Sequence, residues 1–193
     1  MHLARRARAG FTLIELMLVV VLVGISAAMV APSIMRTMAS SRTGRCQYDV
    51  ARLLRTARGN AIASGRAQLV DFDPGTGAMR VNLYRGDSSS CARSAWGGIV
   101  GVDQPIDSVW AEDYSIGGHS VLVAVTAAGA GAPRQICFEP DGDRLDRPNT
   151  TGPFVRNAGL VTVAFDRIEP DGLSSDPQRR IIVPQFGAPR ITR

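Results

Sequence analysis

The chain offers few residues whose type and spacing suit catalysis. It contains no lysine, which excludes catalysis by a lysine amine, and His119 is its only histidine beyond the first ten residues. No serine lies in a Gly-x-Ser-x-Gly turn, and no glycine-rich phosphate-binding loop is present. We therefore interpret His119, which follows Gly117 and Gly118, as a loop residue, and we predict neither an enzyme active site nor a bound cofactor.

A cluster of carboxylates raises the question of a metal site. The cluster consists of Glu139, Asp141, Asp143 and Asp146. Calcium prefers clustered oxygen ligands, so a calcium site is one interpretation. The spacing misses the EF-hand pattern, however, and Pro140-Asp141-Gly142 is typical of an ordinary turn, which we favour. The C-x-x-C and H-x-x-x-H spacings of zinc ligands are also missing from the sequence, so we predict no metal site.

The arginines are unevenly distributed. Residues 36–66 hold seven arginines against one acid, residues 67–178 are acidic, and residues 179–193 hold four arginines and no acid. The last group is Arg179, Arg180, Arg190 and Arg193. Several arginines on one hairpin could neutralise DNA phosphates and give a sequence-independent affinity that falls steeply with salt. A solvated strand edge and docking to an acidic neighbouring subunit are the alternatives, and both compete with DNA contact.

The longest apolar run extends from residue 11 to residue 31, and its only polar residues are Thr12, Glu15 and Ser26. As a helix it would span roughly 31 Å at about 1.5 Å per residue, enough for the bilayer core. A secretory signal peptide cut after a site such as "ISAAMVA" is the alternative. Against it stands Glu15, because a carboxylate costs about 2.5–3.5 kcal/mol at the bilayer centre and a disposable segment gains nothing from that cost.

Glu15 acquires a partner if the chain is cut between Gly10 and Phe11. The new amino group on Phe11 would be positive and only four residues from Glu15. Opposite charges attract strongly in a medium of low dielectric constant. The carboxylate could pair with its own amine or with that of a neighbouring subunit, which would set the register between the two.

The stretch "RARAGFTLIELMLVVVLVGI" resembles the prepilin signature of type IV pilins and type II secretion pseudopilins. The resemblance implies that a prepilin peptidase cuts after Gly10 and methylates the Phe11 amine. It also implies that Glu15 meets the Phe11 amine of the adjacent subunit during assembly. Pro32 stands where many members carry a proline that loosens the helix in the filament, as expected from the backbone donor that proline lacks.

The leader also predicts orientation. Arg5, Arg6 and Arg8 favour the cytoplasmic side, which leaves the residues after about Ser33 outside the inner membrane, in the periplasm. We therefore divide the chain into a leader (1–10), a transmembrane and filament-core helix (11–35), an amphipathic stem helix (36–66) and a periplasmic domain rich in β-strands (67–193).

The stem and the domain have distinct patterns. Apolar residues recur at helical spacing between Val50 and Ile62, and Gly65 is a plausible stop. Strands are predicted in five places: a hairpin over 66–86, single strands over 119–126, 134–140 and 159–168, and a closing hairpin over 179–193 with Gly187 near its turn. One or two short strands are expected within the loop between Asp87 and Gly118. The predicted fold class is α+β, with one long N-terminal helix packed on an antiparallel sheet.

Three later segments resemble the GspH/FimT group of minor pilins and pseudopilins: "DVARLLRTARGNAIASGRAQLV", "CFEPDGD" and "RRIIVPQFGAPRITR". The resemblance implies a structural subunit at or near the tip of a type II secretion pseudopilus or a type IV pilus. Its partners would be the peptidase, the inner membrane and other pilins or pseudopilins. Some members of this group bind DNA through a basic C-terminal hairpin, so DNA uptake is the alternative function.

Three cysteines allow three single pairings and leave one thiol over. A periplasmic domain can keep a disulfide. Because Cys46 belongs to the stem while Cys91 and Cys137 belong to the domain, we favour the Cys91–Cys137 pair. Three buried free thiols are the alternative.

Overall fold

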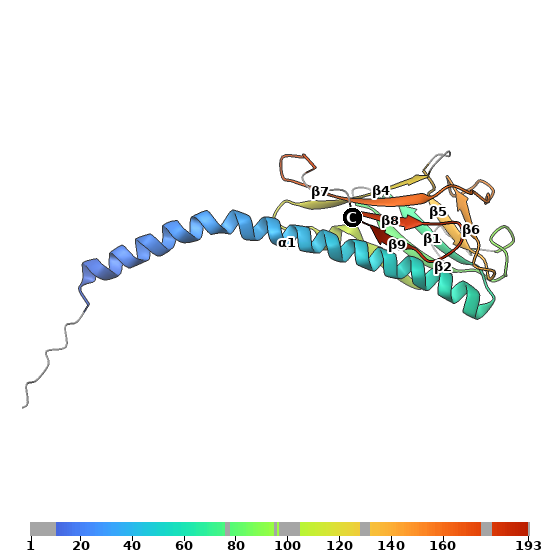
Figure 1. Cartoon of the computed structure of the whole chain (residues 1–193), viewed down its shortest axis with the longest axis horizontal. Coiled ribbons are helices and arrows are strands. Elements are labelled where there is room, and N and C mark those ends of the chain that lie inside the picture. The colour runs from blue at the N-terminus through green and yellow to red at the C-terminus, as the bar shows by residue number, and fades with distance from the viewer. Residues whose placement is uncertain are drawn as a thin grey trace, which may run out of the picture. The chain divides into compact units, whose positions relative to one another are not determined.

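The computed structural model describes residues 11–75, 78–94, 96, 105–127, 132–174 and 179–192 (Figure 1). The chain forms two compact units, Met1–Thr37 and Met38–Arg193, and each is described here by itself. We call residues 11–37 the N-terminal unit and residues 38–193 the body.

The N-terminal unit is helical from its third described residue. Helix α1 (Leu13–Ser64) begins here and continues through Pro32 without interruption. One proline removes a single backbone donor, and the flanking turns keep their hydrogen bonds. Hydroxyls also bond to the helix carbonyls nearby: Ser33 Oγ donates to Val30 O at 2.8 Å and Thr37 Oγ1 donates to Ser33 O at 3.0 Å.

The part of α1 in the body is amphipathic, as predicted. Val50, Leu53, Leu54, Ala57 and Ala61 are fully buried, whereas Ile62 is 51% exposed and does not belong to the buried stripe. The helix ends at Ser64, and its Ala61 carbonyl accepts the Gly65 amide at 3.1 Å. Gly65 has φ +66°, a conformation that glycine adopts without steric cost, so it stops the helix where the sequence predicts.

The strands of the described residues form two antiparallel sheets rather than the single sheet that we expected. The first has the order β3-β2-β1-β5-β6 and consists of β1 (Gln68–Asp73), β2 (Arg80–Arg85), β3 (Asp107–Trp110), β5 (Gln135–Phe138) and β6 (Arg144–Arg147). The second has the order β4-β7-β8-β9 and consists of β4 (Ser120–Ala127), β7 (Val161–Ile168), β8 (Arg179–Val183) and β9 (Arg190–Thr192). The α+β class, with a long N-terminal helix packed on antiparallel strands, is confirmed.

The main core lies where α1 and the inner faces of both sheets meet. Its largest buried side chains include Leu53 of α1, Phe138 of β5 and Phe165 of β7. Arg144 of β6 is also fully buried, and its guanidinium pairs with Asp146 at 2.9 Å and donates to the Val183 carbonyl of β8. This arginine links the two sheets inside the body.

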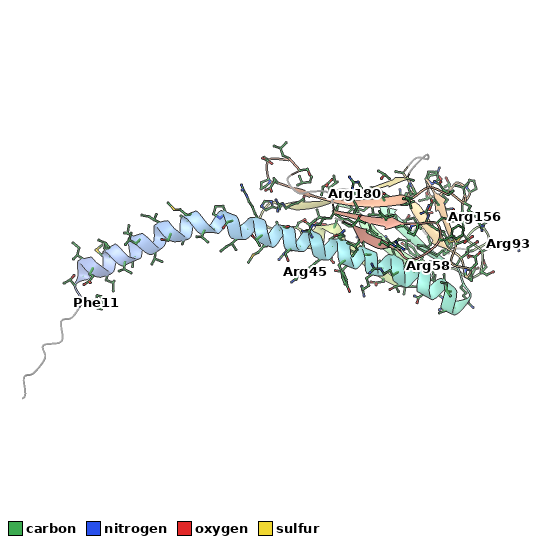
Figure 2. All side chains as sticks on the ribbon, in the orientation of Figure 1. Phe11, Arg45, Arg58, Arg93, Arg156 and Arg180 are labelled. Carbon is green, nitrogen blue, oxygen red and sulfur yellow. A yellow bond between two sulfur atoms is a disulfide. The ribbon has the colours of Figure 1, made fainter. Side chains whose placement is uncertain are left out.

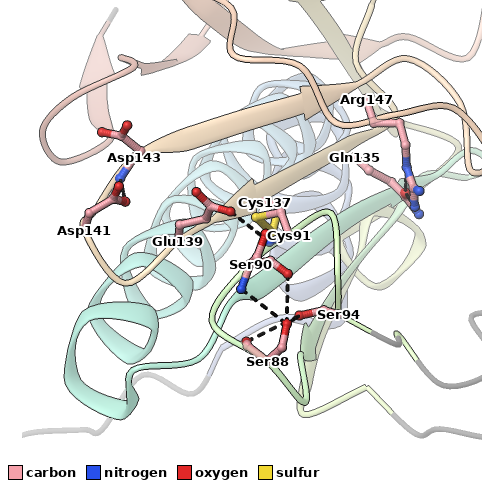
Figure 3. Close-up of a disulfide and its surroundings, with 10 residues drawn as sticks. All are labelled: Ser88, Ser90, Cys91, Ser94, Gln135, Cys137, Glu139, Asp141, Asp143 and Arg147. Carbon is pink, nitrogen blue, oxygen red and sulfur yellow. Dashed lines mark hydrogen bonds between the residues drawn. A yellow bond between two sulfur atoms is a disulfide. The ribbon is translucent and has the colours of Figure 1, made fainter.

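A second apolar layer covers the other face of the first sheet. It contains Ala67, Leu69, Cys91 and Cys137, and the structure joins the two cysteines in a disulfide with a Cα–Cα distance of 6.1 Å (Figure 3). This is the pair that we favoured from the sequence. Cys46 is a buried free thiol of α1, and burial, with a smaller contribution from Asp49, raises its pKa to about 12. The remaining thiol is therefore chemically quiet at neutral pH.

Candidate functional site

Helix α1 carries its own cap at the amino end. The Glu15 amide approaches Thr12 Oγ1 at 3.3 Å and the Thr12 carbonyl at 3.1 Å, and α1 begins at Leu13. A threonine side chain in this position satisfies one of the donors that every helix start leaves unpaired. The cap comes from the Thr12 hydroxyl, so it does not require the Glu15 carboxylate.

Phe11 and Glu15, the residues predicted to pair during assembly, both lie on the surface at this end of α1. Phe11 is 84% exposed, and its label in Figure 2 marks the start of the described chain. Gly10 and the three leader arginines lie outside the described residues. If the chain is cut before Phe11 as predicted, the new amine and the Glu15 carboxylate would be two opposite charges close enough to pair within or between chains.

The rest of the N-terminal unit exposes its apolar side chains all around the helix (Figure 2). Every residue from 11 to 38 is exposed. Among the described residues, α1 is the one helix long and apolar enough to cross a membrane by length and composition, although a signal sequence passes the same test. A surface of this kind needs a lipid or protein environment to cover it.

The four C-terminal arginines do not form one cluster. Arg179 is turned toward α1, where its Nη2 donates to Ser40 Oγ at 3.0 Å. A Cβ on Gly44 would collide with this guanidinium, which gives the helix glycine a packing role. Arg193 lies outside the described residues. Neighbouring residues of a strand point to opposite faces, so Arg179 and Arg180 cannot act together on one surface.

Arg180 and Arg190 do share a face. Arg180 pairs with Thr192 in the β8–β9 register and Arg190 pairs with Ile182, which places both arginines on the outward side of the hairpin. Arg55 of α1 donates its Nε to the Pro189 carbonyl, just before β9, at 3.1 Å. The count of arginines in the sequence suggested one basic cluster. The alternation of side chains along β8 places Arg179 and Arg180 on opposite faces instead.

The four carboxylates of the 139–146 stretch have separate partners, and Figure 3 shows three of them, Glu139, Asp141 and Asp143. Glu139 Oε1 accepts the Cys91 amide at 2.9 Å, and Asp141 Oδ1 accepts the Asp143 amide at 2.9 Å across the turn. Asp143 pairs with Arg156 at 2.7 Å. Asp146 belongs to the buried Arg144 pair described above. Within the described ranges, no group of three or more His, Cys, Asp or Glu residues is arranged to hold a metal ion.

His119 lies in the turn just before β4, in agreement with its interpretation as a loop residue, and its side chain is buried there. Its Nδ1 lies 2.9 Å from Glu169 Oε2, and Arg167 Nη2 lies 2.8 Å from the other oxygen of the same carboxylate. His119 is 8% exposed and forms a β-bridge with Ile116 just before β4. The carboxylate therefore holds two loops together.

Sequence reasoning missed a polar row that crosses the first sheet beside the disulfide layer. Asp71 lies opposite Asn82 on one side and opposite Gln135 on the other, and Gln135 lies opposite Arg147. Gln135 donates to Asp71 at 2.8 Å and accepts from Arg147 Nε at 2.7 Å. Burial is the main cause that raises the pKa of Asp71. These residues come from four strands, so only the register could reveal the row.

Comparison with known proteins supports the N-terminal resemblance. Residues 5–31 match the family model described as the prokaryotic N-terminal methylation motif. The chain is 32% identical over 88 residues to the type IV major alpha-pilin of Moraxella bovis, a match that covers 46% of this chain and 55% of that pilin.

A solved structure of similar length was also found. It is the type IV minor pilin FimU of Pseudomonas aeruginosa, which has 13% identity, covers 86% of this chain and 92% of that one, and gives a TM-score of 0.38. A TM-score this low supports no structural argument. The similarity to type IV pilins is therefore carried by the methylation motif and by the 88 residues matched to the Moraxella pilin.

Proposed function

We propose that this chain is a minor pilin or pseudopilin of the GspH/FimT type that assembles at or near the tip of a type IV filament. The observation that carries the proposal is the methylation motif at residues 5–31, which leads directly into an exposed apolar helix that keeps one carboxylate, Glu15, near its start. The role is structural, and no enzyme chemistry is assigned to it.

In the proposed mechanism, prepilin peptidase cuts between Gly10 and Phe11 and methylates the new amine. The amine then pairs with Glu15 of a neighbouring subunit. Because the Thr12 hydroxyl caps α1, the start of the helix does not depend on the Glu15 carboxylate. The carboxylate is therefore available to pair with the amine of a neighbouring subunit. In a water-poor filament core an unpaired carboxylate is costly, so the subunit gains free energy only in the register where the charges meet.

Before assembly, the same helix would anchor the chain in the inner membrane as a single span, with the leader arginines on the cytoplasmic side and the body in the periplasm. Pro32 would loosen α1 only inside the filament, where neighbouring subunits replace the lipid. The partners would be the peptidase and the other pilins or pseudopilins of the filament.

Two measurements test this proposal. Intact-mass spectrometry of the mature protein is expected to show a chain that begins at N-methylated Phe11. A mature chain that begins near Pro32 would instead establish a cleaved signal peptide and refute the proposal. Crosslinking mass spectrometry of a tagged copy in intact cells then separates the two machines: links to a major pseudopilin indicate type II secretion, and links to a major pilin indicate a surface pilus.

DNA uptake is the second candidate, and the shared outward face of Arg180 and Arg190 is the observation that favours it. The test is fluorescence anisotropy of the solubilised chain with duplex DNA over a series of salt concentrations. If DNA binds through this face, Arg180→Ala with Arg190→Ala should weaken binding and make the salt dependence shallower, while Arg93→Ala should leave both unchanged. Binding that survives the double substitution would remove these two residues from the role.

A further inference from the structure

A groove of about 770 Å³ opens on the body where the end of β1, the start of β2, the end of β3 and the start of β4 approach one another. The short helix η1 (Ala111–Tyr114) forms part of its rim. The lining combines one aromatic ring, one guanidinium, two carboxylates and two hydroxyls: Trp110, Arg80, Asp73, Glu112, Ser115 and Ser120. A volume of this size is typical of sites for small organic ligands or for a few units of a polymer.

Trp110 is the feature that points to a ligand. The Arg80 guanidinium lies over its ring, 3.3 Å from the centroid, and the two residues are directly opposite in the β2–β3 register. One face of the indole is therefore covered, yet the residue remains 39% exposed. Its exposed area must come from the other face and the edges. A cation–π contact fixes the ring plane and leaves a flat apolar surface open to solvent.

The polar groups around the ring have hydrogen-bonding capacity to spare. Asp73 Oδ1 accepts from the Gly75 amide at 3.2 Å and from Arg134 Nη2 at 3.0 Å, and its second oxygen has no partner within the part of the chain that the structure describes. The exposed Glu112 side chain likewise has none there. Carboxylates accept hydrogen bonds only, whereas the Ser115 and Ser120 hydroxyls can both donate and accept.

Hydrogen bonds to α1 and between neighbouring segments hold the walls of the groove in place. Tyr114 of η1 donates its hydroxyl to Asp49 of α1 at 2.7 Å, and Arg42 of α1 donates to the Ser115 carbonyl at 3.0 Å. The Ala111 amide donates to the Met79 carbonyl at 3.0 Å, which ties the end of β3 to the β1–β2 turn. A site whose walls are already ordered loses less entropy when a ligand binds.

We propose that this groove binds a neutral polysaccharide chain, with one sugar ring against the open face of Trp110. The axial hydrogens of a pyranose give it an apolar face that suits the indole, while its hydroxyls can donate to Asp73 and Glu112 and accept from Arg80. Asp73 and Glu112 are balanced by Arg80 and by the Arg134 guanidinium that pairs with Asp73, so the charges cancel and favour a neutral ligand over an acidic glycan or a basic peptide. The inference does not depend on the proposed filament function.

Fluorescence titration of the full chain, in a zwitterionic detergent without a sugar headgroup, tests the proposal. The chain has two tryptophans, so Trp96→Phe leaves Trp110 as the single reporter. Trp96 packs in the disulfide layer, with its ring centroid 6.4 Å from that of Phe154, and serves as the matched control position. The probes are cellohexaose and the hexamer of N-acetylglucosamine, with oligogalacturonate as the acidic comparison.

The expected result is that at least one neutral hexasaccharide changes the Trp110 emission. Calorimetry should then show that Trp110→Phe weakens its binding by about tenfold or more, while Trp96→Phe leaves it unchanged. Glu112→Gln, which keeps the size of the side chain, should weaken binding by a smaller factor and serves as a second probe if Trp110→Phe fails to fold. Absence of binding by both neutral hexasaccharides at millimolar concentration would overturn the proposal, as would unchanged affinity in both groove variants or tighter binding of oligogalacturonate.

Discussion

The N-terminal unit and the body differ in where their apolar side chains lie: the N-terminal unit exposes them and the body buries them in a core. In the N-terminal unit every side chain from residue 11 to residue 37 is exposed, and the helix rests on local hydrogen bonds and its threonine cap. In the body, α1 and two sheets enclose a shared core with a buried ion pair, and a disulfide layer covers the other face of one sheet. The body can therefore fold from its own contacts, whereas the exposed apolar surface of the N-terminal unit is of the kind that a membrane or other subunits cover.

The first prediction separates assembly from folding and carries the largest expected effect. Glu15→Ala should leave the chain in the membrane and the thermal unfolding of the body unchanged, while its recovery in sheared filaments falls by about tenfold or more, because the intersubunit ion pair is lost. The matched control is Ser26→Ala, since Ser26 Oγ donates only to its own Leu22 carbonyl at 2.8 Å. Normal recovery of the Glu15 variant would break the pairing mechanism.

Removing the guanidinium that links the two sheets should affect the body alone. Arg144→Ala leaves Asp146 buried without its partner, so we expect a loss of about 3–5 kcal/mol in the free energy of unfolding, measured with urea on the solubilised chain. Arg156→Ala is the matched control, because its pair with Asp143 involves a 55% exposed arginine side chain and should contribute at most about 1 kcal/mol. Equal losses in the two variants would contradict the role given to burial.

Loss of the disulfide should come next in size. Cys91→Ala with Cys137→Ala should lower the free energy of unfolding of the body by about 2–4 kcal/mol, because the disulfide no longer constrains the unfolded chain across a sequence separation of 46. Circular dichroism during urea unfolding would measure it. Reducing agent should reproduce the loss in the native chain and have no effect on the variant, and a loss in both would point to another target.

The cap should matter only in the N-terminal unit. Thr12→Val removes the hydroxyl that caps α1 and should destabilise the first turn by about 1 kcal/mol, since the Glu15 amide loses an acceptor. Faster hydrogen exchange at residues 13–15 in micelles would report it, with Thr12→Ser as the control that restores the hydroxyl. Faster hydrogen exchange in the body as well would contradict the prediction that the cap affects the N-terminal unit alone.

The smallest effect concerns the polar row of the first sheet. Burial raises the pKa of Asp71 above its ordinary value, so the folded state holds its proton to a higher pH than the unfolded state does. The protonated Asp71 therefore contributes to the free energy of unfolding at low pH, and this contribution is lost as the pH rises through the folded-state pKa of Asp71. Asp71→Asn should raise the free energy of unfolding at pH 7 by less than about 1 kcal/mol, and the gain should vanish below the unfolded-state pKa. A gain that persists at pH 3 would refute the titration argument.

Features that depend on local chemistry could be predicted from the sequence. The apolar run, the position of Glu15, the stop at Gly65 and most strand positions follow from spacing and turn residues, each of which acts within a few neighbours. Strand β6 (Arg144–Arg147) was not predicted, because its charged residues are typical of a loop. Only the structure shows that Arg144 and Asp146 form an ion pair in the interior.

The sequence by itself thus determined a long N-terminal helix with an apolar, charge-bearing start, and an antiparallel body behind it. Only the tertiary structure decided that the strands divide into two sheets, that the C-terminal arginines are split between opposite faces, and that Trp110 and Arg80 meet at the rim of a groove. The physical reason is the distance along the chain over which each kind of interaction acts. Helix periodicity and turn chemistry are written in residues a few positions apart, whereas register and burial bring together residues that the sequence holds tens of positions apart.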